Sequence, residues 1–368
     1  MKIFSDYTSI TLNNTFLNGE EIISYCEKQK TSLFDQVAEF MKDWLLPHAT
    51  IELATSGSTG KPKSILVGKN QMLLSASRTA EYFHFKQGQN ALLCLPANYI
   101  AGKMMIVRAL FSGLHLVVVT PSQNPLESLK PGSIIHFAAM IPLQLNQSIH
   151  HPSLSQIKAI LLGGGPLDEN LEKLTQKVNT EIFHGYGMTE TLSHIALRRV
   201  NGKNSSQSYQ ALKGIELGKD NRNCLTITAK GFLEETLITN DLVSFTGTNE
   251  FTWQGRYDNI INSGGIKLIP EEIEAGLQLL LDRRFYVAGV DDEKLGKKLI
   301  LVIEGEAFNK IELASLKDKM EDFINQYAIP KEIFFVKNFA NTVSGKINRL
   351  KTSSLIVFQK KMIFFHGD

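Results

Sequence analysis

A short segment rich in hydroxyls and lysines is the first candidate for chemistry in this chain of 368 residues. The segment reads TSGSTGKPK, occupies positions 55–63 and directly follows a predicted strand. Backbone N–H groups near glycine, hydroxyls and ammonium groups together suit a polyphosphate, although a flexible solvated turn is the alternative interpretation. Its glycine spacing differs from that of a Walker A loop. The candidate phosphate ligands are Thr55, Ser56, Gly57, Ser58, Thr59, Gly60, Lys61 and Lys63.

Four further motifs follow along the chain. They read HGYGMTET at 184–191, TNDLV at 239–243, GRYDNII at 255–261 and NTVSGKI at 341–347. Together with the 55–63 segment they resemble, in type and order, the motifs of the adenylate-forming superfamily of acyl-CoA synthetases, luciferases and peptide-synthetase adenylation domains. That superfamily joins a carboxylate to the α-phosphorus of ATP and expels pyrophosphate. The reaction requires charge neutralisation and in-line positioning more than a protein nucleophile.

The resemblance implies three catalytic residues. Thr189 would offer its hydroxyl to a phosphate, and Glu190 would offer a hard carboxylate to Mg²⁺, which prefers oxygen ligands. Without the resemblance, Glu190 could be an ordinary surface acid. Lys346 occupies the position of the family's catalytic lysine, whose ammonium reaches the carboxylate and the α-phosphate; by sequence alone it is one of many lysines.

The nucleoside has its own candidates. The ring of Tyr186 suits stacking on adenine, although core packing is the commoner role of a tyrosine ring. The resemblance places Asp241 and Arg256 at the ribose hydroxyls; otherwise they could be a turn residue and a surface cation. An adenine-side glycine segment, for which a simple turn is the alternative, comprises Gly163, Gly164, Gly165 and Pro166. The nucleotide-binding set is completed by His184, Gly185 and Gly187.

A hinge and a thioester site are implied next. Superfamily members run two half-reactions with one site by rotating a small C-terminal domain. Asp258 matches the pivot position, although a plain turn residue is the alternative. Ser263, Gly264 and Gly265 would then line the channel for CoA.

Three segments indicate which carboxylic acid would be activated. LLGGGP at 161–166, GMTETLSHIA at 187–196 and SGGIKLIP at 263–270 resemble the o-succinylbenzoate–CoA ligase family of menaquinone biosynthesis. A buried second carboxylate of such an acid needs a cation or several donors. The candidates are Ser193, His194, Lys103 and Arg108, with a structural role for His194 as the alternative. A CoA ligase for another aryl or short-chain acid, and an inactive nucleotide-binding homologue, are the other hypotheses.

The elements that must position these residues are predicted as α/β with α+β. Strand candidates at 50–54, 91–95, 115–120, 134–137, 158–162 and 181–184 alternate with amphipathic helices. One helix presents Met72, Ala76 and Thr79 on one face, and another begins after Asp168 as N-cap. This alternation predicts a parallel sheet covered by helices. Short strands at 224–228, 235–239, 242–245 and 251–253 then predict an antiparallel portion.

The remaining sequence predicts a small α+β domain. Pro270 suits the first position of a helix, and strands at 285–290, 299–303 and 333–336 flank a second helix around Leu316. We therefore expect a large domain at 1–254, shortened at its N-terminus relative to the family, a hinge at 255–258 and a small mobile domain at 259–368 that carries the catalytic lysine.

Composition excludes several other functions. Lys+Arg 39 against Asp+Glu 37 gives a net charge of +2, which excludes a broad polycationic surface for nucleic acid. Three separated cysteines fit a reducing compartment, and no C-x-x-C zinc pattern occurs. The apolar run 104–119 is too short and too charged for a membrane span of about 20 residues. We expect a cytoplasmic enzyme without membrane insertion that uses ATP, Mg²⁺ and CoA as co-substrate; its partners are small molecules, and a homodimer is considered as its assembly.

Overall fold

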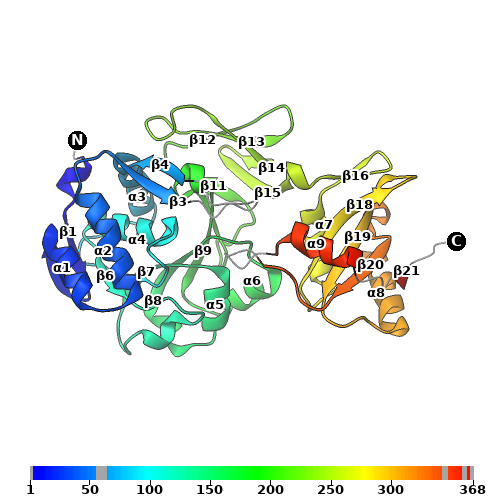
Figure 1. Cartoon of the computed structure of the whole chain (residues 1–368), viewed down its shortest axis with the longest axis horizontal. Helices are drawn as coiled ribbons and strands as arrows, with labels where there is room; N and C mark the ends of the chain where they lie inside the picture. The colour runs from blue at the N-terminus through cyan, green and yellow to red at the C-terminus, as the bar shows by residue number, and fades with distance from the viewer. Residues whose placement is uncertain (1–2, 55–63, 342–346, 359–362, 365–368) are drawn as a thin grey trace. The chain divides into compact units, whose positions relative to one another are not determined.

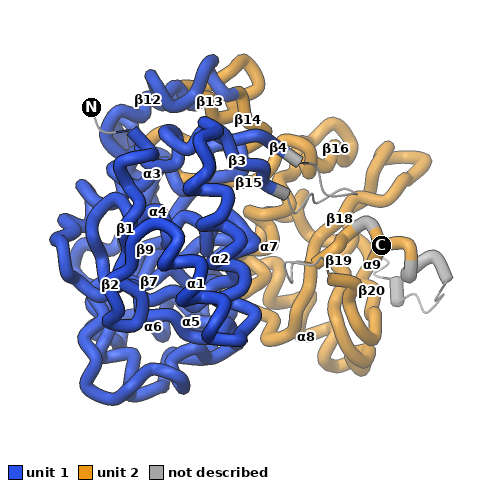
Figure 2. Tube along the Cα trace, turned by 60° about the vertical axis from the view of Figure 1, so that its left-hand side comes forward, with its two compact units in different colours: residues 1–217, 227–237, 246–251 blue, residues 218–226, 238–245, 252–368 orange. Residues whose placement is uncertain are grey.

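A computed structural model gives the fold of the chain (Figure 1) and describes residues 3–54, 64–341, 347–358 and 363–364. Its internal contacts divide the chain into two compact units, coloured separately in Figure 2. Unit 1 comprises residues 1–217, 227–237 and 246–251, and unit 2 comprises 218–226, 238–245 and 252–368. The predicted domain boundary at 254 and the hinge at 255–258 stay predictions.

A parallel sheet forms the centre of unit 1, as the alternation of apolar strands and helices predicted. The parallel order is β9-β8-β7-β5-β6-β1, while β2 pairs antiparallel with β1 and β10 and β11 extend the sheet antiparallel beyond β9. The strands are β1 (Ser9–Leu12), β2 (Thr15–Asn18), β5 (Asn90–Leu93), β6 (His115–Val118), β7 (Ile135–Met140), β8 (Ile157–Leu162), β9 (Glu181–Gly187), β10 (His194–Arg199) and β11 (Tyr209–Ala211).

Helices pack against this sheet through buried apolar faces. Met72, Ala76 and Thr79 of α3 are fully buried, as their spacing predicted. Asp168 caps α6, because its carboxylate accepts a hydrogen bond from the Leu171 N–H at 2.8 Å. None of the described helices is both long enough and apolar enough to cross a bilayer. The helices of unit 1 are α1 (Glu20–Lys28), α2 (Ser32–Leu45), α3 (Lys69–Tyr82), α4 (Ile100–Ser112), α5 (Pro142–Ser148) and α6 (Glu169–Thr175).

Four further strands follow in the predicted antiparallel portion. Parts of this portion belong to unit 1 and parts to unit 2. The strands are β12 (Glu216–Lys219), β13 (Cys224–Thr228), β14 (Leu237–Gly247) and β15 (Glu250–Arg256). The prediction of two strands at 235–239 and 242–245 was wrong, because β14 is continuous. Asn240 and Asp241, which suggested a turn, are accommodated within the strand by polar partners: Arg222 donates to Asn240, and Trp253 donates to Asp241.

Unit 2 contains a mixed sheet with helices, in agreement with the predicted α+β pattern. The order is β17-β16-β19-β20-β21, and β18 also pairs with β19. Pro270 begins α7, as predicted, and Glu271 and Glu272 lie in its first turn, near the positive end of the helix dipole. The strands are β16 (Ile261–Ser263), β17 (Ile266–Leu268), β18 (Phe285–Asp292), β19 (Gly296–Glu304), β20 (Glu332–Val336) and β21 (Ile363–Phe364). The helices are α7 (Pro270–Gln278), α8 (Lys310–Phe323) and α9 (Arg349–Phe358).

A buried lysine holds the hairpin that flanks the 55–63 segment. The hairpin is formed by β3 (Thr50–Ala54) and β4 (Ser64–Gly68), paired antiparallel along their whole length. Lys69 follows β4 and is 0% exposed; its Nζ donates to the carbonyl oxygens of Trp44 at 3.1 Å and Leu46 at 2.6 Å. These carbonyls lie at the C-terminal end of α2, where a cation also interacts favourably with the helix dipole. Lys69 therefore joins the end of α2 to the base of the hairpin.

Replacing this ammonium tests its contribution. Lys69→Met should lower the free energy of unfolding by about 1–3 kcal/mol, because buried carbonyl groups lose their donor. Urea denaturation of the full chain measures the change. Lys42→Met on α2 is the matched control, since the ion pair of Lys42 with Glu27 is exposed and the replacement should change stability little. Equal losses in the two variants would contradict the structural role assigned to Lys69.

Candidate active site

The 184–191 motif spans the end of β9 and the turn that leads to β10. It contains a short 3-10 helix, η4 (Thr189–Thr191). Thr191 is buried, and its hydroxyl accepts from the Met188 N–H at 2.9 Å and donates to the Ser193 carbonyl at 2.8 Å. A Cβ at Gly187 would lie 2.2 Å from that same Ser193 carbonyl oxygen. Glycine is therefore required for the close approach of the two sides of the turn.

The two predicted catalytic residues of this turn differ from Thr191 in exposure. Thr189 is half-buried and Glu190 is exposed. Within the described residues, no cluster of three or more His, Cys, Asp or Glu side chains could hold a metal ion. Mg²⁺ is commonly held by one or two carboxylates together with substrate phosphates rather than by an all-protein cage. A single exposed carboxylate at Glu190 therefore fits the predicted role.

A register shift in β10 separates the neighbouring polar groups. His194 pairs with Gly187, whereas Arg198 pairs with His184, and the shift falls between His194 and Ala196. Directly opposed residues point to the same side of a sheet, and sides alternate along a strand. The shift therefore places His194 on the face of Gly187 and Arg198 on the opposite face, with His184.

The face of His194 carries a closed ring of hydrogen bonds. Arg108 on α4 contacts the Ser193 hydroxyl through Nη2 at 2.8 Å and the Thr79 hydroxyl through Nε at 3.3 Å. Ser193 contacts Nδ1 of His194 at 3.1 Å, and Thr79 contacts Nε2 of His194 at 3.3 Å. Three of the four predicted acid-pocket residues, together with Thr79 of α3, thus form one group, which we call the arginine ring.

The Thr79 hydroxyl determines which groups of the arginine ring donate and which accept. Thr79 donates to the Ser75 carbonyl at 3.2 Å, so its oxygen accepts from Arg108 and from Nε2–H of His194. Nδ1 of His194 then accepts from Ser193. Burial and the charge of Arg108 hold the pKa of His194 well below its ordinary value, so this imidazole is neutral at physiological pH.

Arg108 is the unusual member of the arginine ring. It is 2% exposed, and burial lowers its pKa to about 10. No carboxylate forms an ion pair with it among the described residues. Among the described residues, its Nη1 has only the sulfur of Met105, at 3.6 Å, as hydrogen-bond partner, and sulfur is a weak acceptor. The ring therefore contains a buried cation with unused donor capacity.

Lys103, the fourth predicted pocket residue, lies elsewhere on α4. Its Nζ lies 5.8 Å from the centre of the Phe40 ring of α2. Burial lowers its pKa, while Asp43 and Glu39 act in the opposite direction. The structure thus places Lys103 with α2 rather than with Ser193 and His194.

The face of β9 and β10 opposite His194 carries the residues predicted to bind the adenine base. Tyr186 makes an edge contact with Phe251, with ring centres 5.1 Å apart. His184 is buried and contacts the carbonyl oxygen of Gly165 through Nε2 at 2.9 Å. The predicted adenine-side segment 163–166 follows β8, and Gly164 has a φ of 81°, which favours glycine. His184 and the glycine segment are therefore neighbours, with Tyr186 on the same strand face as His184.

Unit 2 brings the predicted ribose residues together. Asp241 is 7% exposed, and its Oδ1 accepts from Nε1 of Trp253 at 3.1 Å. Nη1 of Arg256 lies 4.0 Å from the same oxygen. Nη2 of Arg256 binds Asp258 at 2.9 Å, and Asn240 also donates to Asp258 at 3.2 Å. The predicted ribose pair and the predicted pivot residue thus belong to one connected group.

The predicted CoA-channel residues form a tight hairpin in unit 2. Ser263 pairs with Ile266 at the end of β16 and β17, which leaves Gly264 and Gly265 as the turn. Both glycines have positive φ, 57° and 84°. This is the conformation of the two-residue turn that matches strand twist.

Two predicted sets lie outside the described residues. They are the phosphate segment 55–63 and the catalytic Lys346. Other residues of the site were not predicted at all: Thr79, Arg198, Tyr209 and Trp253. Helical spacing indicated that Thr79 is buried, but no local signal connected it with His194. Tyr209 is the first residue of β11, and no local signal connected it with His184.

Comparison with known proteins identifies the family. A family model described as AMP-binding enzyme matches residues 28–215, more than half of the chain. The 2-succinylbenzoate–CoA ligase of Listeria innocua is 26% identical over 357 residues, covering 89% of this chain and 74% of that protein. The protein of the same name from Escherichia coli is 27% identical over 300 residues, covering 76% and 64%.

Solved structures agree with this assignment. The acyl-CoA synthetase (AMP-forming)/AMP-acid ligase II-like protein of Dyadobacter fermentans has 38% identity and a TM-score of 0.60, covering 90% of this chain and 98% of that one. The o-succinylbenzoate coenzyme A synthetase of Bacillus subtilis, solved with ATP and magnesium ion, has 16% identity and a TM-score of 0.75, with coverages of 94% and 97%, and so shares the fold. The order of the motifs, the fold and these matches establish that the chain belongs to the AMP-binding enzyme family.

Proposed function

We propose that the chain is an ATP-dependent acid–CoA ligase whose acid is o-succinylbenzoate. In the first step a carboxylate oxygen attacks the α-phosphorus of ATP, and pyrophosphate leaves. In the second step the sulfur of CoA attacks the acyl carbonyl, the thiol loses its proton, and AMP leaves. Relatives named 2-succinylbenzoate–CoA ligases that align with 89% of the chain support this proposal.

The observation that carries the choice of acid is the buried cation of the arginine ring. Arg108 is desolvated and has hydroxyls but no carboxylate as partners within the described residues. A guanidinium favours planar carboxylates, and a buried charge without a counter-ion is costly. A dicarboxylic acid would supply the missing anion with one carboxylate and leave the other for adenylation. Ser193, which is half-buried, would form the open edge of this subsite.

The phosphates and the metal are assigned to unit 1. The 55–63 segment would hold the β- and γ-phosphates, and Thr189 would donate to a phosphate. Glu190 would hold Mg²⁺, which when bound neutralises phosphate charge. Tyr186 and the 163–166 segment would bind adenine.

The remaining roles are assigned to unit 2. Asp241 would accept from the ribose hydroxyls, because an ionised carboxylate can accept several hydrogen bonds at once. Arg256 would donate to the same sugar, and Asp258 would act as the pivot. Gly264 and Gly265, which lack side chains, would leave room for CoA. Cytoplasmic location and a homodimer stay predictions.

A panel of acids tests the proposal directly. Pyrophosphate release with ATP and CoA should be fastest with o-succinylbenzoate among aryl, short-chain and dicarboxylic acids. Faster turnover of an acid with a single carboxylate would favour the alternative of a ligase for another acid. No turnover with any acid would favour an inactive nucleotide-binding homologue.

Replacing the buried cation tests the substrate subsite. Arg108→Met should raise KM for o-succinylbenzoate roughly 10- to 100-fold, since a hydrogen bond to a charged group contributes about 1.5–3 kcal/mol. KM for benzoate should change much less. Arg78→Met is the matched control: Arg78 is also buried, but it donates to the Lys213 carbonyl and stacks on Phe232. The control should leave the ratio of the two KM values unchanged, and an equal rise for both acids in Arg108→Met would contradict the subsite.

The lysine of the 341–347 motif separates the two half-reactions. Lys346→Ala should slow pyrophosphate release about 10²- to 10³-fold, the effect of removing one preorganised donor from developing charge. The same variant should still convert a supplied acyl-adenylate and CoA into the thioester. Rapid-quench assays of each half-reaction measure this, with Lys337→Ala as a control lysine from the same unit. Equal loss of both half-reactions would contradict the assigned role.

A further inference from the structure

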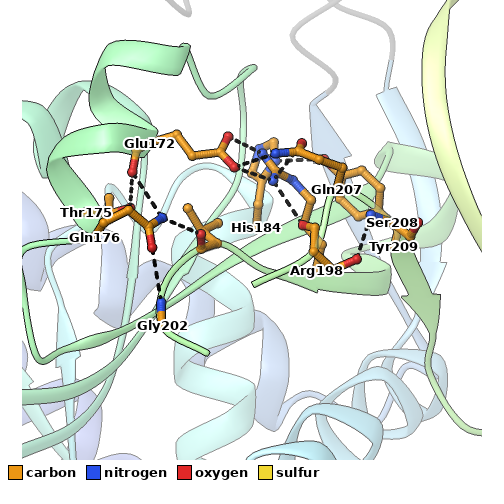
Figure 3. Close-up of polar contacts among 11 residues, drawn as sticks. Glu172, Thr175, Gln176, His184, Arg198, Gly202, Gln207, Ser208 and Tyr209 are labelled. Carbon is orange, nitrogen blue, oxygen red and sulfur yellow. Dashed lines mark hydrogen bonds and ion pairs between the residues drawn. The ribbon is translucent and has the colours of Figure 1, made fainter. Parts of the chain in front are cut away.

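Polar side chains from four elements converge on one side of the sheet in unit 1 (Figure 3). Glu172 comes from α6, His184 from β9, Arg198 from β10 and Tyr209 from β11. They lie on the face opposite the arginine ring, because the register shift in β10 turns Arg198 away from it. None of the roles proposed above uses Glu172, Arg198 or Tyr209.

The outer end of the group is a neutralised ion pair. Arg198 is 6% exposed, and its two terminal nitrogens each contact one carboxylate oxygen of Glu172 at 3.0 Å. Nε2 of Gln207 donates to the same carboxylate at 2.8 Å, and its Oε1 accepts from Arg198 at 3.2 Å. Arg198 also donates to the Ser206 carbonyl. This bidentate geometry fixes the guanidinium plane, and the charge has its counter-ion.

The fixed guanidinium lies beside a buried tyrosine. The Cζ atom of Arg198 is 5.8 Å from the centre of the Tyr209 ring, and Tyr209 is 9% exposed. The Tyr209 hydroxyl lies 2.7 Å from Nδ1 of His184. The ring of Tyr209 also stacks on Phe251, with centres 5.5 Å apart. Apolar and cationic contacts thus hold the hydroxyl against the imidazole.

The Gly165 carbonyl determines the direction of each hydrogen bond made by His184. The carbonyl oxygen of Gly165 can only accept, so Nε2 of His184 carries the hydrogen. Burial lowers the pKa of His184 to about 4, so the ring is neutral and Nδ1 is an acceptor. The Tyr209 hydroxyl therefore donates to Nδ1. One tautomer and one ring orientation of His184 satisfy both partners.

The bond from His184 thereby fixes the Gly165 carbonyl, two residues beyond Gly163, whose N–H donates to the Met140 carbonyl at 3.1 Å. Apart from the chain neighbours, no atom of the described residues lies within 4 Å of a Cβ built at Gly163 or Gly165, and Gly164 has positive φ. Three successive glycines have large conformational freedom in the absence of ligand. The bond from His184 removes part of that freedom before the nucleotide binds.

We propose that Glu172, Arg198, Tyr209 and His184 form a positioning relay that presets the 163–165 backbone for the adenine base. The proposal rests on the proposed function in assigning that segment to adenine. The relay residues are positioning residues: they act through the Gly165 carbonyl. Preorganisation of this kind improves affinity by reducing the ordering cost of binding.

Removing one hydroxyl tests the relay. Tyr209→Phe keeps the ring but deletes the donor to His184. The dissociation constant of AMP, measured by calorimetry on the full chain without any acid, should rise about threefold to tenfold, equivalent to about 0.7–1.4 kcal/mol. KM for ATP should rise by a similar factor, whereas KM for the acid should stay within about twofold. Tyr82→Phe is the matched control, because Tyr82 contacts Phe183 and Phe83 through its ring and should leave AMP binding unchanged.

A second pair of variants distinguishes the loss of the hydrogen bonds from misfolding of the chain. His184→Gln keeps a donor and an acceptor in one side chain, whereas His184→Ala removes both, so His184→Gln should bind AMP more tightly than His184→Ala at comparable thermal stability. Unchanged AMP affinity in Tyr209→Phe, or equal losses for AMP and acid, would overturn the relay. Failure of the unmodified chain to bind AMP would instead overturn the nucleotide assignment of the proposed function.

Discussion

Desolvation of polar side chains around β9 and β10 is the constraint on which the site depends. Buried polar groups must find partners within the fold, so each fixes the orientation of its neighbour. Arg198 and Arg108 differ in the kind of partner that they find. Arg198 meets the carboxylate of Glu172 and is neutralised, whereas Arg108 meets only hydroxyls and a sulfur among the described residues. The first arrangement is complete in itself. Under the proposed function an anionic substrate would complete the second arrangement, so that Arg198 and Arg108 would have different functions.

A single register shift keeps these two arrangements apart. Without the shift in β10, His194 and Arg198, four positions apart, would point to the same side of the sheet. With it, His194 faces the side of Gly187, and Arg198 faces the side of His184. The acid and the base are therefore assigned to opposite sides of one pair of strands. The same strands position both groups, yet no hydrogen bond of the arginine ring is shared with the relay.

Local signals in the sequence predicted much of the fold. The cap at Asp168 and the proline at Pro270 identified α6 and α7, because helix ends depend on the residues at the ends. The two halves of β14 were not joined, because the partners that accommodate Asn240 and Asp241 come from distant positions. The relay left no local signal for the same reason: Glu172 and Tyr209 are 37 positions apart, and only the pairing of β9, β10 and β11 brings them together.

The predicted acid pocket shows that residues close together in one sequence segment need not contact the same site. Lys103 and Arg108 occupy one segment and were predicted together, but they are five positions apart on a helix, an angular separation of about 140°. Arg108 therefore contacts Thr79 of α3, while Lys103 lies over Phe40 of α2. The 184–191 motif is assigned to the nucleotide in the proposed function, and Ser193 and His194 follow it directly in the sequence. Their electrostatic environment comes from the helices: α4 supplies the charge, and α3 supplies the hydroxyl that closes the ring. Under the proposed function the choice of acid would therefore depend on residues outside the family motifs, where helical periodicity determines which side chain of α4 contacts Thr79.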